Sequence, residues 1–497
     1  MNGFFRVLDN RHSTWGIAAC LLPALLIFLM PTGFYPNEYN YFMLAFRRVS
    51  PESFSNFSAA FDASDARIAF ELGLGYLIKW LGYHAAQMVL RLAMAATYAA
   101  AIGYLLSVLK LSALDGLIVL SVFVVSGEDI LGKEWLFQGV ESKTFAYALV
   151  MIGLACAVEG RLTRATWAAA TATYVHFLVG GFWLIALLAY DAVRDFSPRR
   201  LARALGLYVA LVGPLLLLIA YEQLGASGVG SDGLTANVIY ASRAPHHIAP
   251  FLDRAQFRIW MPDIAFLFAL SAAFLYLLRT EQAKSRPLVR WVTVLLCYLI
   301  AALVLSALDA KTAYLGKFYL FRPSSLILFC AIVAFVGLFN DLENKTGIKQ
   351  RIRQVAFLLL IPVAAMQAIE ARLVDLSHTR RAMFQDIARM NAFIVNTTGP
   401  DDIILVQPGG EYVFPMGAMP MLIDRPTLVS YKFIPTNNLD LFRWYDLLQY
   451  RDRVFDESCK DIGRYPVRYL LMTQRPEMKT PCGKVVWQSD NFALVAP

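Results

Sequence analysis

Acidic side chains gather in two connections within the first third of the chain. Glu38 follows directly on a long apolar run that ends just before residue 34, at the start of a long polar loop. The segment 127–143, GEDILGKEWLFQGVESK, carries more acids and two lysines. A carboxylate in such a place can accept the proton of a hydroxyl group, as a general base does. The candidate acids are Glu38, Asp62, Asp65, Glu128, Asp129, Glu134 and Glu141.

Cationic and histidine side chains concentrate in later connections. They occur in ASRAPHHIAP (241–250) and in KTAYLGKFYLFRPSS (311–325). Arginine, lysine and histidine can bind a phosphate group and neutralise the charge that builds on it. Such cations, together with a base, suit a reaction that expels an anionic leaving group. The candidates of this kind are Lys143, His176, Arg243, His246, His247, Lys317 and Arg322.

Taken one at a time, each of these residues could simply be a polar residue of a hydrated loop. Their joint pattern predicts more, because the acids come mainly from the connections 34–84 and 128–143 and the cations mainly from the connections 222–259 and 309–322. If the helices form a bundle, these ends converge on one cavity at the membrane surface. The adjacent His246 and His247 side chains diverge on a helix or strand, so hydrogen bonding to a phosphate or sugar is favoured over a metal site. No cofactor is required, and a divalent metal stays open.

Composition identifies the broad class of the protein. The chain has 497 residues, of which 58% are hydrophobic and 16% charged, and its mean hydropathy is +0.51. A soluble domain carries about 25% charged residues. The net charge of +8 lies in short segments between apolar runs, which favours membrane topology and contact with anionic lipids over nucleic-acid binding. The protein is therefore predicted to be a polytopic α-helical membrane protein.

Eleven apolar stretches are long enough to be candidate membrane helices, which need about 20 residues. The pair 164–178 and 180–193 is short, and we expect either a tight hairpin that turns at Gly180-Gly181 or one broken element. The eleven stretches are 14–33, 85–108, 112–128, 144–160, 164–178, 180–193, 201–221, 260–279, 288–308, 322–341 and 354–370.

The connections between these stretches alternate in character. Short basic connections predict the cytoplasmic side, and the longer, aromatic-rich connections predict the periplasm or cell exterior. This places the N-terminus in the cytoplasm and the C-terminus outside. The basic set is 161–164, 194–203, 279–290 and 343–353, and the outer set is 34–84, 128–143, 222–259 and 309–322.

Two domains are expected. Residues 1–370 form the transmembrane part with a long first outer loop, 34–84. Within that loop, the spacing of apolar residues in 51–82 predicts one or two amphipathic helices that lie along the interface. Residues 371–497 contain short strand-like runs bounded by Pro, Gly and Asp, which predict a small periplasmic α/β domain. Cys459 and Cys482 share this compartment, so they could form a disulfide.

The chain resembles the GT-C superfamily of membrane glycosyltransferases. The likeness rests on an acid directly after the first span (NEY, 37–39), a long first outer loop, an acidic second outer loop and a C-terminal domain after the last span. KEWLFQGVESKTFAYAL, YVHFLVGGFW and RAPHHIAP are also similar to segments of uncharacterised bacterial membrane proteins grouped near these enzymes. The usual first-loop acid of the family is an Asp, where this chain has Glu38 preceded by Asn37.

The resemblance implies transfer of a sugar from a polyprenyl-phosphate-linked donor on the outer face of the bacterial inner membrane. The acceptor would be a glycan, lipid or protein, and the reaction would invert the anomeric carbon. Glu38 would be the general base, and Arg322, Lys317, His246 and His247 would neutralise the released phosphate. Trp135 would be a stacking platform for the sugar, whose hydroxyl groups would bind Glu141 or Glu128.

Other functions stay open at this stage. A ligase or polymerase that moves whole lipid-linked glycans would share most of these features. A transporter would place charged residues inside the spans, near the midplane, whereas Arg91 and Asp115 lie near span ends here. A non-catalytic scaffold of a polysaccharide export system would keep the fold.

Overall fold

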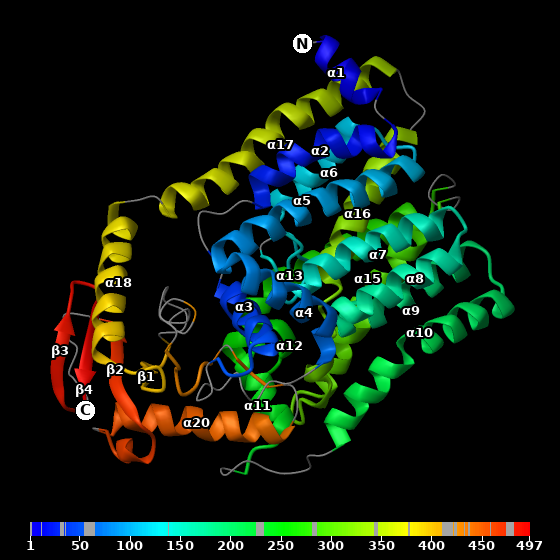
Figure 1. The fold of residues 1–497 in the computed structure, drawn as a ribbon. Coiled ribbons are helices and arrows are strands. Elements are labelled where there is room, and N and C mark those ends of the chain that lie inside the picture. The colour runs from blue at the N-terminus through cyan, green and yellow to red at the C-terminus, as the bar shows by residue number, and fades with distance from the viewer. Residues whose placement is uncertain are drawn as a thin grey trace. The chain divides into compact units, whose positions relative to one another are not determined.

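The computed structural model divides the chain into two compact units (Figure 1). The first is Met1–Met30, Val89–Leu216 and Tyr240–Glu370, and the second is Pro31–Met88, Leu217–Ile239 and Ala371–Pro497. The second unit thus joins the predicted C-terminal domain with segments that the sequence assigned to the membrane part. The structure describes residues 2–10, 12–29, 34, 36–53, 65–137, 139–224, 233–280, 286–341, 346–375, 378–409, 421, 425–431, 433–435, 438–457, 459–473 and 482–497.

Each of the eleven predicted apolar stretches forms a helix, which confirms a multi-span helical protein. Seven of these helices are long and apolar enough to cross a membrane, and α2, α6 and α7 are shorter apolar helices. The eleven helices are α2 (Thr14–Leu29), α5 (Tyr83–Val108), α6 (Ala113–Val125), α7 (Ser142–Val158), α8 (Leu162–Val175), α9 (Phe177–Arg194), α10 (Pro198–Leu224), α13 (Arg254–Leu277), α15 (Pro287–Leu308), α16 (Ser324–Asp341) and α17 (Thr346–Asp375).

The outward faces of several long helices are apolar. Within the most apolar window of α17, only 6% of residues are buried inside the protein, and α10 and α13 are also mostly exposed. Water would penalise so large an apolar surface, whereas the hydrocarbon core of a bilayer accepts it. By contrast, α16 is 72% buried over its window, so it lies inside the helical unit.

The pair α8 and α9 is a close-packed helical pair with its break at His176. The sequence left open a tight hairpin that turns at Gly180-Gly181 or one broken element, and a turn at the two glycines is wrong, because Gly180 lies inside α9. A Cβ atom at Gly180 would come within 2.2 Å of the Thr173 backbone nitrogen. The glycine is therefore needed for the close approach of the two helices, and His176 makes the turn.

The described residues of the first predicted outer loop contain two helices, of which the second lies in the segment 51–82 whose spacing predicted a helix and the first was not predicted. These are α3 (Pro36–Val49) and α4 (Ile68–Leu81), which pack against each other. A Cβ atom at Gly75 of α4 would lie 2.2 Å from the Ala45 carbonyl oxygen of α3, so the two backbones touch. Buried Glu71 of α4 accepts hydrogen bonds from Arg48 of α3 at 2.7 Å and from Arg67 at 3.0 Å. The bond from Arg48 links the two helices. The placement of these helices at a membrane interface stays a prediction.

The C-terminal part is a small α/β domain, as predicted. Its four-stranded sheet has the order β1-β2-β4-β3, with β1 parallel to β2 and the other pairs antiparallel. Helix α18 packs on the sheet through a core that includes Met390, Ile404 and Leu494. The elements are α18 (His378–Thr397), β1 (Ile403–Val406), α20 (Asn438–Asp456), η6 (Ile462–Arg464), β2 (Val467–Thr473), β3 (Lys484–Gln488) and β4 (Phe492–Ala496).

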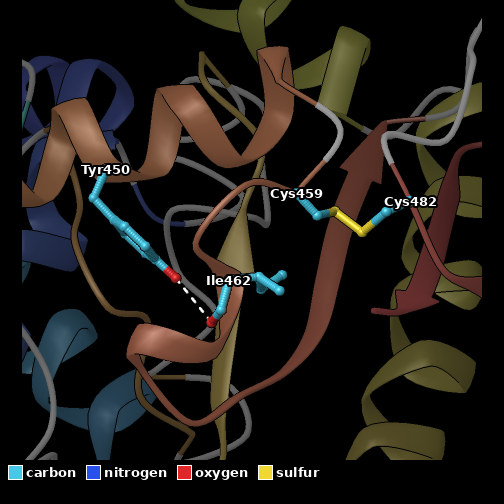
Figure 2. The surroundings of a disulfide bond; sticks show 4 residues. All are labelled: Tyr450, Cys459, Ile462 and Cys482. Carbon is cyan, nitrogen blue, oxygen red and sulfur yellow. Dashed lines mark hydrogen bonds between the residues drawn. A yellow bond between two sulfur atoms is a disulfide. The ribbon is translucent and has the colours of Figure 1, made fainter.

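Cys459 and Cys482 form a disulfide in this domain (Figure 2), with their Cα atoms 5.7 Å apart. The bond links the end of the α20 region to the residues just before β3. Nearby, the Tyr450 hydroxyl donates a hydrogen bond of 3.0 Å to the Ile462 carbonyl. Together these contacts fasten the segment between α20 and β2. The pairing that the sequence left open is thus formed.

The basic connections of the first unit bind the ends of neighbouring helices. Arg353 contacts Asp115 at 2.8 Å and Asp9 at 2.7 Å, and Arg194 donates to the Ala157 carbonyl at 2.9 Å. Other contacts join the connection before α7 to the connections before α13 and α16. The remaining elements are α1 (Asn2–Asp9), η2 (Asp65–Arg67), α11 (Ala236–Arg243), α12 (Pro245–Ile248) and η3 (Tyr314–Phe318).

Candidate functional site

A buried ion pair lies at the centre of the site in the first unit. Glu134 belongs to the connection between α6 and α7, and Lys143 lies in the first turn of α7. Lys143 Nζ is 2.9 Å from Glu134 Oε2 and 3.8 Å from Glu141 Oε2. All three residues are at most 4% exposed. Removing charges from water is costly unless they are paired, so this trio is a fixed feature of the fold.

Two further connections, those before α13 and before α16, contribute side chains to the same carboxylate. Arg322, just before α16, places Nε 3.6 Å from Glu134 Oε1, and His247 of α12 places Nδ1 3.9 Å from the same oxygen. The structure therefore brings together Glu134, Lys143, His247 and Arg322, which the sequence analysis had assigned to one site. The convergence follows from topology, because these connections join the same ends of packed helices.

The cations set the charge state of Glu134. Burial by itself raises the pKa of a carboxyl group, but Lys143, Arg322 and His247 outweigh burial and lower the pKa of Glu134 to about 2. Glu134 is therefore ionised at neutral pH and a poor proton acceptor. Its position suits a counter-ion that holds two permanent cations in place.

His247 is neutral at pH 7. Burial lowers its pKa to about 4, against the opposing influence of Glu134. Its Nδ1 lies 2.5 Å from the Gly132 carbonyl oxygen. A carbonyl can only accept, so Nδ1 carries the proton and Nε2 keeps its lone pair.

Arg322 is held from several sides. Its Nη1 donates to His176 Nε2 at 2.8 Å, and its guanidinium carbon lies 4.1 Å from the centre of the Tyr319 ring. The Tyr147 hydroxyl donates to the Arg322 carbonyl at 2.7 Å, and the Tyr319 hydroxyl is 3.3 Å from that of Tyr240. His176 thus acts through Arg322, from the break between α8 and α9. The sequence analysis missed these three tyrosines, although Tyr319 stands three residues before Arg322.

Trp135 lies beside this cluster. Lys143 Nζ is 3.5 Å from the centre of its ring, a cation–π contact. The ammonium covers one face of the indole, so a sugar cannot stack on that face. The ring centres of Trp135 and His247 are 6.0 Å apart.

Glu128 and Asp129 support the connection that carries Glu134. Glu128 Oε2 accepts from the backbone nitrogens of Leu136 at 2.8 Å and Phe137 at 2.9 Å, and burial raises its pKa against these bonds. Asp129 Oδ1 contacts the Ser324 hydroxyl and accepts from Leu131 nitrogen at 3.0 Å. Burial raises the pKa of Asp129 to about 8, despite the Ser324 hydrogen bond. These contacts depend on loop geometry and have no sequence signature.

The remaining predicted cationic and histidine residues lie in the same two connections as His247 and Arg322. Arg243 ends α11. The rings of His246 and His247 touch, with centres 4.1 Å apart and planes tilted by 44°, although the sequence predicted that the two side chains diverge. Lys317 lies in η3, where burial lowers its pKa. Among the residues the structure describes, no group of three or more His, Cys, Asp or Glu side chains is placed to hold a metal ion.

Three predicted acids belong to the second unit. Glu38 lies in the first turn of α3 rather than in a loop, and it is fully buried. Gln87 Nε2 donates to Glu38 Oε2 at 2.7 Å, a partner that the sequence analysis missed. The start of a helix favours a carboxylate, because unpaired backbone N–H groups point toward it. Asp65 begins η2, and Asp62 lies outside the described residues.

The comparisons with known proteins find similarity among solved structures. No protein-family model matches the sequence, and no curated protein matches it. Among solved structures, the chain is similar to the crystal structure of ArnT from Cupriavidus metallidurans bound to undecaprenyl phosphate. The likeness covers 97% of both chains at 12% sequence identity and a TM-score of 0.49.

Proposed function

We propose that this protein is a membrane glycosyltransferase that moves a sugar from a polyprenyl-phosphate donor to an acceptor hydroxyl group on the outer face of a bacterial inner membrane. The N-terminus would lie in the cytoplasm and the C-terminal domain in the periplasm. The acceptor would be a glycan, a lipid or a protein. The donor already carries an activated phosphate bond, so the proposal requires no cofactor.

One observation carries the proposal most directly. Arg322 and Lys143, two buried or half-buried cations from different connections, share the single carboxylate Glu134. The Arg322 Nε contact at 3.6 Å is longer than a hydrogen bond. An arginine anchored by His176 and Tyr319, beside a lysine, suits a site that binds phosphate oxygens as negative charge builds on them.

The proposed reaction balances as a single displacement. The acceptor oxygen attacks the anomeric carbon, while the bond from that carbon to the phosphate oxygen breaks. The proton of the acceptor hydroxyl passes to Glu38, and polyprenyl phosphate leaves as the anion. The Gln87 amide would orient the Glu38 carboxylate through its 2.7 Å hydrogen bond. Glu134 would keep Arg322 and Lys143 in place without taking part in proton transfer.

The phosphate-binding role can be tested by substitution of Arg322. Membranes with the wild-type protein, R322A or R322K receive radiolabelled polyprenyl-phosphate hexoses, and transfer of label to envelope acceptors is measured. We expect R322A to lower transfer by about 10²–10³-fold and R322K to lose less, because it keeps the charge but not the planar fork. K133A is the control, since Lys133 is an exposed cation of the connection between α6 and α7 and pairs with Asp263. Wild-type transfer by folded R322A would contradict this role.

A further inference from the structure

Trp135 carries a buried hydrogen-bond donor with no protein partner. Its Nε1 atom is buried, and no group in the described part of the chain accepts its hydrogen. A buried unsatisfied donor costs about 1–3 kcal/mol. Another buried indole of this unit, that of Trp291, avoids the cost, because its Nε1 donates to the Ala186 carbonyl at 2.7 Å. The orphaned N–H of Trp135 therefore calls for an acceptor that the protein itself does not supply.

His247 offers the complementary group on the neighbouring ring. Its Nδ1 hydrogen is used by the Gly132 carbonyl, so Nε2 presents a lone pair. Within the described residues, no protein group hydrogen-bonds to Nε2. The two rings are tilted by 51° with their centres 6.0 Å apart, close enough for one small group to contact both.

We propose that Trp135 Nε1 and His247 Nε2 together bind one hydroxyl group of the donor's sugar. The indole donates to the hydroxyl oxygen, and the imidazole accepts the hydroxyl hydrogen. A hydroxyl is the group that both donates and accepts, whereas a phosphate oxygen would face the lone pair of Nε2 unfavourably. The phosphate therefore belongs to Arg322 and Lys143, and the neutral pair selects the sugar. This inference rests on the proposed function and replaces the expected stacking role of Trp135.

The test separates sugar recognition from phosphate binding. The purified full chain in detergent is titrated with polyprenyl phosphate and with polyprenyl-phosphate glucose, galactose and mannose. The variants W135F and H247N each remove one half of the pair. Asn can still donate to Gly132 but has no group at the Nε2 position, whereas H247Q restores an amide there. Trp15 and His12 are exposed, so W15F and H12N serve as controls.

We expect the wild type to bind at least one sugar lipid about tenfold more tightly than bare polyprenyl phosphate, since a lost hydrogen bond that leaves its partner buried costs about 1–3 kcal/mol. W135F and H247N should lose that preference, with less than a twofold change for the bare lipid, and H247Q should keep part of it. W135F should unfold no more readily than W15F. A preference that persists in folded W135F and H247N, or that is missing in the wild type, would overturn the inference. Failure of the wild type to bind even the bare lipid would overturn the proposed function as well.

Discussion

Lys143 Nζ lies 2.9 Å from Glu134 Oε2, and both side chains are buried. Arg322 approaches the other oxygen of the same carboxylate at 3.6 Å. One acid of the second outer connection thus balances two cations that reach it from different parts of the chain. The Glu134 carboxylate is therefore the centre of the site.

Removal of the Glu134 charge should destabilise the protein strongly. In E134Q, Lys143 keeps Glu141 at 3.8 Å and the Trp135 ring, but Lys143 and Arg322 both lose the charge of Glu134. Breaking a buried pair from one side costs about 3–5 kcal/mol. The measurement is thermal or denaturant unfolding in detergent. D263N is the control, because the Lys133–Asp263 pair is exposed and such pairs are worth about 0–1 kcal/mol. Equal stability of E134Q and D263N would contradict the central place of Glu134.

Stability should fall as pH rises, in part through Asp129. Its pKa is about 8 in the folded protein, against an ordinary value of 3.8. Between these values the folded state keeps a proton that the unfolded state has lost, so the stabilisation is complete below pH 4 and lost as pH passes 8. D129N mimics the protonated form. We expect the melting temperature of the wild type to drop more than that of D129N between pH 6 and 9, and parallel curves would show that Asp129 is ionised in the fold.

Gly180 should be essential for the position of His176, whereas Gly181 should not be. In G180A the new Cβ meets Thr173 atoms at 2.2 Å and 2.3 Å, whereas at Gly181 the nearest atom is 3.8 Å away. G180A should push α8 from α9, cost at least about 1–3 kcal/mol, and weaken binding of polyprenyl phosphate because His176 holds Arg322. Melting temperature and lipid affinity are both measured. Identical behaviour of G180A and G181A would refute the close-contact argument.

Loss of the disulfide should loosen the C-terminal domain. Cys459 and Cys482 are 23 residues apart in sequence, and closing a loop of this size stabilises a fold by about 2–4 kcal/mol. In limited proteolysis, the double variant C459A/C482A should be cleaved faster within residues 371–497. The control C297A, which replaces an exposed free cysteine, should match the wild type. Unchanged proteolysis of the double variant would count against a stabilising role.

The helical part was predictable because the signal is long and repeated. Each of the eleven apolar stretches forms a helix, since a membrane helix requires about 20 apolar residues and few sequences meet this by chance. The turn between α8 and α9 was misplaced, because a glycine pair favours turns and also close helix packing. Only three-dimensional packing against Thr173 distinguishes the two uses.

The site was predictable in its components but not in their roles. Glu134, Lys143, His247 and Arg322 were expected together because alternating connections gather at one end of a bundle. Glu128 and Asp129 have the same residue types, yet they bind their own loop, which depends on backbone geometry. Gln87 and Tyr240 lie in helices with no pattern that marks them. Glu38 was expected in a polar loop, and the helix that buries it begins only two residues earlier.

The measurement that tests the proposed function most directly compares wild type, E38Q and E38D in one transfer assay. Membranes with matched amounts of folded protein receive radiolabelled polyprenyl-phosphate hexoses, and both label transfer and polyprenyl phosphate release are followed. We predict transfer by the wild type, a loss of about 10²–10⁴-fold in E38Q and partial activity in E38D. E52Q, which changes an exposed acid that follows α3, should match the wild type. Wild-type transfer by folded E38Q would remove Glu38 as the base, and absence of any transfer by the wild type would contradict the glycosyltransferase itself.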